Sequence, residues 1–364
     1  MRVGLLQEGD HSGTTLHARY REMIREATLA DELGFSSWGT SEQHFSPTRF
    51  GVASPEVLYA AVAEHTSKLI LRNMSAVLVT YNHPIHVAER ISTLDLISDG
   101  RAQLCTARSN NQTTLSTFGV TMHNTKDQWS ESLEIVIKAM TEETLEHHGE
   151  FWDIPPCTVV PKPLQKPHPP ISVAATSTGS HRNAGQRGIG VISFDNYYGY
   201  NYLDECIREY ALGRAEDPEN NTNDYFGIFV PSAYCAATRE EAVETARETT
   251  LEYFKFIMDI YKRLAQTPSY EYMKNIGDLE EHQDDMEFMM KMTPSVMVGT
   301  PEELVEQFSD LERRGVDEVL LRVDGFGHEQ HMKSLELIGR EVIPHLDGGD
   351  TAPTARAALV APVS

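Results

Sequence analysis

Short apolar runs alternate along the chain with longer segments in which apolar residues recur every three or four positions. The short runs are typical of buried strands, and the longer segments have the period of amphipathic helices. Strands and helices that alternate in this way predict parallel pairing through right-handed crossovers. The expected strands cover residues 3–6, 35–41, 69–79, 102–107, 171–175, 190–194, 226–236 and 318–323.

The helices expected between these strands carry recognisable start and stop signals. The segment 16–33 has helical spacing and ends before Gly34, which suits a C-terminal cap. Thr300 is followed by Pro301 and Glu303, the pattern of a capping box with proline at the first helical position. The other expected helices cover residues 55–67, 84–97, 125–148, a segment that reaches 188, 200–212, 239–263, 300–314 and a closing segment to about 345.

Three segments interrupt the alternation. Residues 150–170 are dense in proline and predict an irregular excursion or a short hairpin. Residues 264–294 combine acidic pairs with several methionines, and we expect them to form a lid insertion over a pocket mouth. Residues 347–364 have the composition of a disordered tail. The predicted fold is therefore α/β, a single (β/α)8 TIM barrel over residues 1–346 with the lid inserted at 264–294.

Four of the expected strands end in clusters of small polar residues. The clusters begin at Ser41, Thr80, Arg108 and Thr176. In a barrel of parallel strands the carboxyl ends converge on one face, and active sites lie on that face. We therefore interpret the four clusters as parts of one shared pocket.

The cluster after the fourth expected strand suits phosphate binding. Arg108 has a guanidinium that can bind a phosphate through two parallel hydrogen bonds. Asn110 and Asn111 carry amides that can orient a ring edge or a reacting oxygen. An ion pair between Arg108 and an acidic neighbour is the alternative.

The turn from Thr176 to Ser180 joins a strand to a helix. Its hydroxyls, among them that of Ser177, lie beside first-turn N–H groups that have no partner inside the helix. Such a turn favours an anion, although helix capping alone also explains serine and threonine here.

Histidines at two kinds of position call for different interpretations. His44 follows the second expected strand, where an imidazole can transfer a proton, whereas its neighbour Gln43 can only form hydrogen bonds. A purely structural His44 is the alternative. The His-x-x-His pairs that begin at His83 and His328 lack a third ligand, so helix-surface histidines are favoured over a metal site.

Composition narrows the choice of partner and compartment. The chain of 364 residues has 54 acidic and 31 basic side chains and a formal charge of -23, which repels nucleic acid and anionic membranes. No apolar run reaches the length of about eighteen residues that a membrane span needs, and a cytoplasmic location is expected. The four cysteines are scattered and indicate neither a disulfide framework nor a zinc knuckle.

Two nucleotide-binding motifs are missing from the sequence. It has neither the Gly-x-Gly-x-x-Gly of a dinucleotide site nor the Gly-x-x-x-x-Gly-Lys of a P-loop. A redox enzyme of this design needs reducing equivalents from outside.

Several blocks of residues recur in the same order in one known family. They are Leu33-Gly34-Phe35 with Trp38, Glu42-Gln43-His44-Phe45, His83-Pro84 with Ala88-Glu89, Leu94 to Arg101, Arg108, Phe118-Gly119, Ala184 to Gly188 and Val298 to Glu303. Through these blocks the chain, from Met1 to about His345, resembles the bacterial luciferase-like, flavin-dependent monooxygenases.

The resemblance implies a cofactor and the residues that bind it. Arg108, Ser177 and Ser180, with Thr176 beside them, match positions where the family binds the FMN phosphate. Ser75-Ala76 matches a site where the family often has a non-proline cis peptide beneath the flavin ring. The 264–294 insertion resembles the mobile lid of luciferase.

The reaction that the resemblance implies is a two-component monooxygenation. FMNH2 from a separate flavin reductase reacts with O2 to a C4a-peroxyflavin, and one oxygen atom is inserted into a small organic substrate. His44 would transfer a proton or contact the substrate oxygen, while Gln43, Asn110 and Asn111 would orient flavin or substrate. A homodimer is also implied.

The chain departs from luciferase at two positions. Luciferase has Glu-His-His-Phe with the first histidine catalytic, and that position is Gln43 here. Its reactive cysteine corresponds to Ala107, so light emission is not implied. Two alternatives stay open, namely an F420-dependent oxidoreductase that transfers hydride on the same barrel and a non-catalytic flavin-binding partner subunit.

Overall fold

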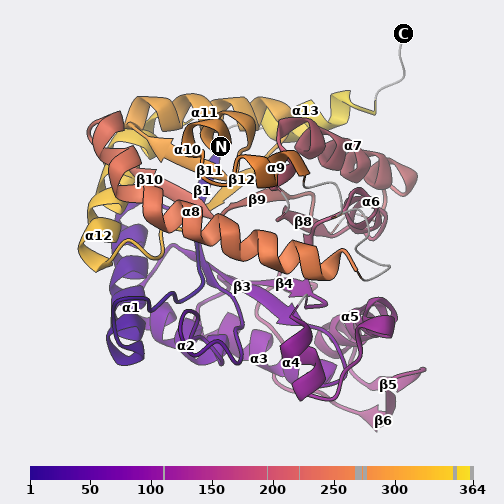
Figure 1. Ribbon diagram of the computed structural model, residues 1–364. Coiled ribbons are helices and arrows are strands. Elements are labelled where there is room, and N and C mark those ends of the chain that lie inside the picture. Colours follow the sequence, from indigo (N-terminus) through magenta and orange to yellow (C-terminus); the bar gives the residue numbers. More distant parts are fainter. Residues whose placement is uncertain are drawn as a thin grey trace. The chain divides into compact units, whose positions relative to one another are not determined.

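The computed structural model describes residues 1–109, 111–194, 196–220, 222–266, 273, 277–346 and 351–360. Eight parallel strands form a closed barrel in the order β1-β12-β9-β8-β7-β4-β3-β2. Figure 1 shows the strands and helices coloured along the sequence. These strands are β1 (Arg2–Gln7), β2 (Ser37–Thr40), β3 (Ile70–Val77), β4 (Ala102–Ala107), β7 (Ile171–Ala175), β8 (Gly190–Ser193), β9 (Phe226–Val230) and β12 (Glu318–Leu321). The predicted barrel is confirmed, and each of the eight expected strands overlaps one strand of the barrel.

Helices follow the strands along the chain. They are α1 (Leu16–Leu33), α2 (Pro55–His65), α3 (Pro84–Ile97), α4 (Gln112–Thr117), α5 (Thr125–Thr141), α6 (Thr178–Gln186), α7 (Tyr200–Glu216), α8 (Arg239–Leu264), α9 (Gly277–Glu281), α10 (Met286–Met292), α11 (Pro301–Arg314), α12 (His328–Leu337) and α13 (Thr351–Ala358). Helix α11 has the expected capping box, because Thr300 and Glu303 each accept a hydrogen bond from the other's backbone N–H.

The chain divides into two compact units. The first unit comprises residues 1–7, 32–36 and 175–364, and the second unit comprises residues 8–31 and 37–174.

In the second unit, one buried hydroxyl ties two strand ends together. The ring of Tyr59 packs edge-on against Trp38, with centroids 5.2 Å apart. Its hydroxyl oxygen accepts a hydrogen bond from Thr40 N–H at 2.7 Å and from Met74 N–H at 3.2 Å. Tyr59 thereby fixes the end of β2 against a β3 segment whose register with β4 shifts between Asn73 and Ala76. The peptide between Met74 and Ser75 in this segment is cis.

A hairpin over residues 145–157 covers the beginning of the stretch 150–170, for which an irregular excursion or a short hairpin was expected. β5 (Leu145–His148) pairs antiparallel with β6 (Asp153–Cys157). The predicted helix 125–148 is wrong after Thr141, because Leu145 is fully buried in the strand that follows. Glu131 in α5 holds the hairpin turn by accepting the backbone N–H groups of Phe151 and Trp152.

In the first unit, the strand expected over 226–236 is two strands. β9 belongs to the barrel, whereas β10 (Ser232–Cys235) pairs in parallel with β11 (Val296–Gly299), a strand that the sequence reading did not include. Pro231 stands between β9 and β10, and proline has no N–H to donate to a ladder. The single-strand prediction is corrected on this ground.

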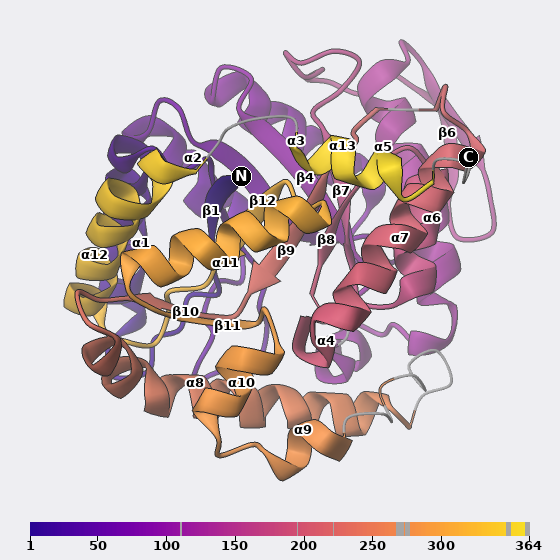
Figure 2. The ribbon, with the colours of Figure 1, turned by 90° about the horizontal axis from the view of Figure 1, so that it is seen from above.

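The described part of the segment 264–294 contains α9 and α10. Residues 267–272 and 274–276 of the predicted lid lie outside the described residues. Helix α10 packs beside α8 (Figure 2), and its Met286 and Met289 are buried. Met286 and Met289 therefore serve packing, whereas Met292 is exposed, and the lid role stays a prediction.

The prediction of a disordered tail from 347 is wrong for residues 351–358, which form α13 against α11 and α7 (Figure 2). The reason is an ion-paired arginine. Arg356 is 3% exposed, donates to Gly315 O at 2.6 Å and pairs with Asp317 and Asp224 at 2.8 and 3.0 Å. These partners are distant in sequence, so composition alone does not reveal them.

We predict that Arg356→Ala lowers the free energy of unfolding by about 3 kcal/mol, because it leaves the largely inaccessible Asp317 carboxylate, 10% exposed, without its ion-pair partner. Urea denaturation followed by circular dichroism measures the loss. Arg340→Ala, on an exposed side chain, is the control and should change stability little. Equal stability of the two variants would show that α13 is not anchored by Arg356.

Candidate functional site

A histidine, a carboxylate and three aromatic rings come together after β2 in the second unit. We call this group the His44 corner, and it comprises Glu42, His44, Phe45, Tyr81 and Phe118. His44 Nε2 lies 2.7 Å from Glu42 Oε1, and their side chains are 17% and 11% exposed. The carboxylate therefore holds the imidazole in one orientation.

Tyr81, after β3, completes a hydrogen-bonded chain. Its hydroxyl donates to Glu42 Oε1 at 3.2 Å. Burial, followed by the charge of Glu42, raises the pKa of Tyr81 far above its ordinary value. The phenol thus keeps its proton and remains a donor to the same oxygen that faces His44.

Aromatic rings line this chain. Phe118 stacks on Tyr81 with centroids 4.7 Å apart and meets His44 edge-on at 5.2 Å. The ring centroid of Phe45 lies 5.5 Å from that of Phe118. The backbone of Phe45 has φ 57°, a left-handed conformation that is uncommon outside glycine. Phe45 and Phe118 are 53% and 41% exposed, so both rings face solvent.

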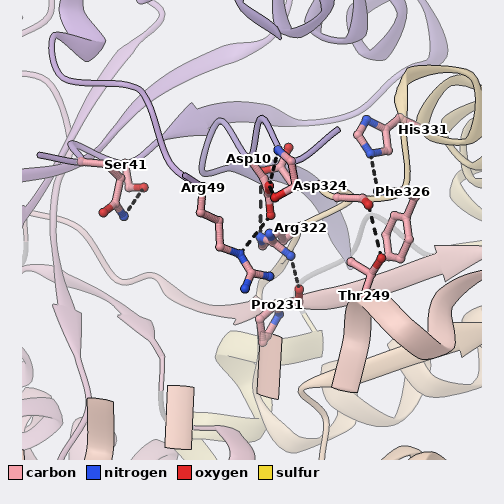
Figure 3. Close-up of polar contacts among 12 residues, drawn as sticks. Asp10, Ser41, Arg49, Pro231, Thr249, Arg322, Asp324, Phe326 and His331 are labelled. Atoms are coloured by element: carbon pink, nitrogen blue, oxygen red, sulfur yellow. Dashed lines mark hydrogen bonds and ion pairs between the residues drawn. The ribbon is translucent and has the colours of Figure 1, made fainter. Parts of the chain in front are cut away.

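Gln43, predicted to orient flavin or substrate, is fixed by hydrogen bonds from both its side chain and its backbone. Its Nε2 donates to Ser41 Oγ at 3.1 Å (Figure 3), and its backbone N–H donates to Val52 O at 2.8 Å. The side chain is half-buried. The structure places Gln43 next to His44 in the loop and gives its amide a local partner.

Of the residues predicted after β4, Asn111 has local partners. Asn111 caps α4 by accepting a hydrogen bond from Thr114 N–H at 3.1 Å, and its own N–H donates to Ser109 Oγ at 3.1 Å. Arg108 is half-buried at the end of β4. Asn110 lies outside the described residues. Asn111 thus serves as a helix cap, and its predicted catalytic role is a separate proposal.

Ser75 and Ala76 lie in the irregular part of β3. The cis bond joins Met74 to Ser75 and so precedes the Ser75-Ala76 pair by one residue. Ala76 is buried and Ser75 is half-buried.

In the first unit, the predicted anion site is the turn from Thr176 to Ser180, which we call the Ser177 turn. Ser177 caps α6, because its Oγ accepts the N–H of Ser180 at 3.2 Å, and the two hydroxyls lie 2.9 Å apart. A Cβ at Gly179 would meet no atom of another segment within 4 Å, so the space beside this residue is open. Tyr202 holds the turn from α7 by donating to Thr176 O at 2.9 Å.

His181, one turn into α6, is a fully buried anchor of the Ser177 turn. Its Nδ1 donates to Ser177 O at 2.8 Å, and its ring stacks on Phe226 at 5.6 Å. Burial lowers the pKa of His181 to about 4, so the ring is neutral at physiological pH. A neutral anchor adds no charge beneath the turn.

The other histidine pairs have structural roles. His83 caps α3 by accepting Ile85 N–H at 3.2 Å, and His331 Nε2 accepts Phe326 N–H at 3.1 Å (Figure 3). Across the described residues, no group of three histidine, cysteine or acidic side chains is arranged to hold a metal ion.

Sequence reasoning missed the partners of the predicted residues. The roles of Glu42, Tyr81 and Phe118 depend on contacts between separate loops. Glu42 and Tyr81 stand in polar clusters at strand ends, whereas Phe118 follows α4. His181 carries a weak signal, because it lies four residues after the capping Ser177 on the first turn of a helix.

A buried arginine at the end of β12 was also missed. Arg322 is 1% exposed, donates to Pro231 O at 3.3 Å (Figure 3) and lies 4.2 Å from the centre of the Tyr253 ring in α8. It joins the carboxyl end of β12 to the bend after β9 and to α8.

Polar side chains at the carboxyl ends of strands in a closed parallel barrel define the class of (β/α)8 enzymes. A family model described as luciferase-like monooxygenase matches residues 1–318. The chain belongs to the luciferase-like monooxygenase family.

Similar proteins include chains named as the oxygenase component or oxygenating constituent of a monooxygenase. The oxygenase component of flavin-dependent trigonelline monooxygenase from Acinetobacter baylyi is 27% identical over 339 residues, which cover 89% of each chain. The oxygenating constituent of 3,6-diketocamphane monooxygenase from Pseudomonas putida, solved with FMN, is 25% identical, with a TM-score of 0.78 over 95% of this chain and 98% of that one.

The fold is shared with a deazaflavin enzyme as well. The F420-dependent tetrahydromethanopterin reductase from Methanopyrus kandleri has a TM-score of 0.72 at 17% identity and covers 95% of this chain and 100% of its own. This likeness shows the fold alone. Within the described residues, no helix has both the length and the apolar character to cross a membrane.

We predict that His181 makes stability fall as the pH drops from 6.5 towards 4. In this window the unfolded chain binds more protons than the folded chain, because folding lowers the pKa of His181, so the free energy of unfolding falls by up to about 3 kcal/mol. Urea titrations at several pH values measure the slope. His181→Asn should flatten it, since the amide can donate to Ser177 O without titrating, whereas His86→Ala, on an exposed side chain, should not. An unchanged slope in His181→Asn would contradict the assignment.

Proposed function

We propose that the chain is the oxygenase component of a two-component monooxygenase that uses reduced FMN and O2 to insert one oxygen atom into a small organic substrate. Membership of the luciferase-like monooxygenase family supports the proposal, as do relatives named as oxygenase components. The observation that carries it is the Ser177 turn, where paired hydroxyls and an open helix N-terminus suit a phosphate.

The residues of the Ser177 turn fit the phosphate of FMN. Ser177 and Ser180 offer hydroxyls, and the absence of a side chain at Gly179 lets an anion approach the backbone N–H groups. We assign Thr176, Ser177 and Ser180 to the phosphate. Arg108 for the same phosphate, and Ser75 and Ala76 for the ring, stay predictions from the sequence.

Reduced flavin supplies the electrons that activate O2, and the protein supplies position, hydrogen bonds and a dry site. We assign His44 to proton transfer or contact with the substrate oxygen, because Glu42 fixes its ring. Gln43, Asn110 and Asn111 would orient flavin or substrate. Closure of the 264–294 segment would exclude water.

A reductase partner follows from this scheme, because FMNH2 must be delivered to the chain. The homodimer and the cytoplasmic location are further proposals that rest on the sequence. The F420-dependent oxidoreductase and the non-catalytic flavin-binding subunit are the alternatives.

An oxygen electrode separates these alternatives. With FMNH2 from a reductase and an aromatic, polyketide-like or aldehyde substrate, we expect oxygen uptake that catalase does not return, because the oxygen is in the product. F420H2 in place of FMNH2 should support no oxygen uptake. Return of half of the oxygen by catalase with every substrate, which is the yield when all the oxygen has become H2O2, would contradict the proposal. So would substrate reduction by F420H2 without oxygen.

We predict that His44→Ala keeps its affinity for flavin and lowers the rate of oxygen uptake coupled to product formation about a hundredfold.

We predict that Ser177→Ala raises the dissociation constant of FMNH2 at least about tenfold, because one hydrogen bond to a charged group is lost. Anaerobic titration of FMNH2 measures it. The matched control is Thr238→Ala, which removes the cap of α8, where Thr238 accepts Glu241 N–H at 3.2 Å. Equal affinity of Ser177→Ala and wild type for FMNH2 would show that the turn is not part of the flavin site.

A further inference from the structure

The His44 corner has a hydrogen-bonding pattern that specifies its ligand. Glu42 Oε1 faces both His44 Nε2 at 2.7 Å and the Tyr81 hydroxyl at 3.2 Å. A carboxylate oxygen only accepts, so both neighbours must donate to it. In the neutral imidazole, Nε2 therefore carries the proton and Nδ1 carries a lone pair.

The second nitrogen of His44 is available to a ligand. In the described parts of the chain, Nδ1 of His44 has no hydrogen-bond partner, and the side chain is 17% exposed. A neutral ring held in this tautomer accepts at Nδ1. A ligand that contacts it must therefore bring an O–H or N–H donor.

The surroundings of His44 favour a flat apolar body. Phe118 meets the imidazole edge-on and lies against Phe45, and these two large rings are 41% and 53% exposed. Exposed aromatic rings gain most from covering by another flat apolar surface. The carboxylate of Glu42 next to His44 disfavours an anionic ligand.

We propose, resting on the proposed function, that the His44 corner binds the substrate and that this substrate is an uncharged, flat aromatic or conjugated molecule that carries a hydroxyl. Its face covers Phe45 and Phe118, and its hydroxyl donates to Nδ1 of His44. Glu42 and Tyr81 are positioning residues, because they hold His44 in the accepting tautomer.

The tautomer is tested by 15N NMR of histidine-labelled protein at pH 8, with the His44 signals assigned from their loss in His44→Ala. We expect wild type to show the Nε2–H form of a neutral ring. Glu42→Ala should give a mixture of tautomers, and Tyr81→Phe, a conservative change, should shift the Nε2 signal. Wild-type protein in the Nδ1–H form, or identical signals in wild type and Glu42→Ala, would overturn the positioning role.

The ligand class is tested by titrating the full chain, without flavin, with 2-naphthol and with 2-methoxynaphthalene, which has the same rings but no donor. We expect 2-naphthol to bind about tenfold more tightly, as one hydrogen bond allows. In His44→Ala the ratio should fall to about one. Phe118→Ala should weaken both ligands alike, and His86→Ala should change neither.

Equal binding of the two probes to wild type, or no binding of either, would overturn the ligand class. Because these titrations use no flavin and no oxygen, they succeed or fail separately from the oxygen-uptake experiment. If the chain binds 2-naphthol through His44 but takes up no oxygen, the inferred ligand class stands and the proposed monooxygenase activity is contradicted.

Discussion

The parallel pairing of eight short strands in a closed barrel determines where this chain can place chemistry. All residues of β2, β8, β9 and β12 are buried, so polar side chains that face a ligand must come after the strands. The hydroxyl of Tyr59 shows how the strand ends are fixed, because it accepts N–H groups from both β2 and β3. The His44 corner and the Ser177 turn each follow a strand end and draw their rigidity from it.

The sequence predicted those parts of the fold that depend on local pattern. The eight barrel strands, α1, α3 and the Thr300 capping box follow from apolar period and from helix start signals. Elements that depend on distant partners were missed. β11 exists because β10 pairs with it, and α13 is ordered because Arg356 reaches Gly315, Asp317 and Asp224. Pro231, in the middle of an apolar run, was the available signal for the break between β9 and β10.

The candidate site likewise has residues that the sequence predicted and partners that it did not. Residue type and strand-end position singled out His44 and Ser177, since histidine and serine carry their chemistry with them. Their partners were hidden from the sequence. Tyr81 lies 39 residues from Glu42 along the chain, and His181 is informative only once its burial and its bond to Ser177 O are known. Glu42 thus changes from a neighbour in a motif to the group that sets the tautomer of His44.

We propose a phosphate site at α6 in the first unit and, in the second unit, an aromatic corner after β2 whose ligand donates a hydrogen bond. The proposed function depends most on the claim that the Ser177 turn recognises the phosphate of a flavin mononucleotide. Anaerobic titration with FMNH2 and with reduced riboflavin, which has the same ring and no phosphate, tests that claim most directly. We expect reduced riboflavin to bind at least about tenfold more weakly than FMNH2, because the charge-assisted hydrogen bonds to the phosphate are lost. Equal affinities would contradict it.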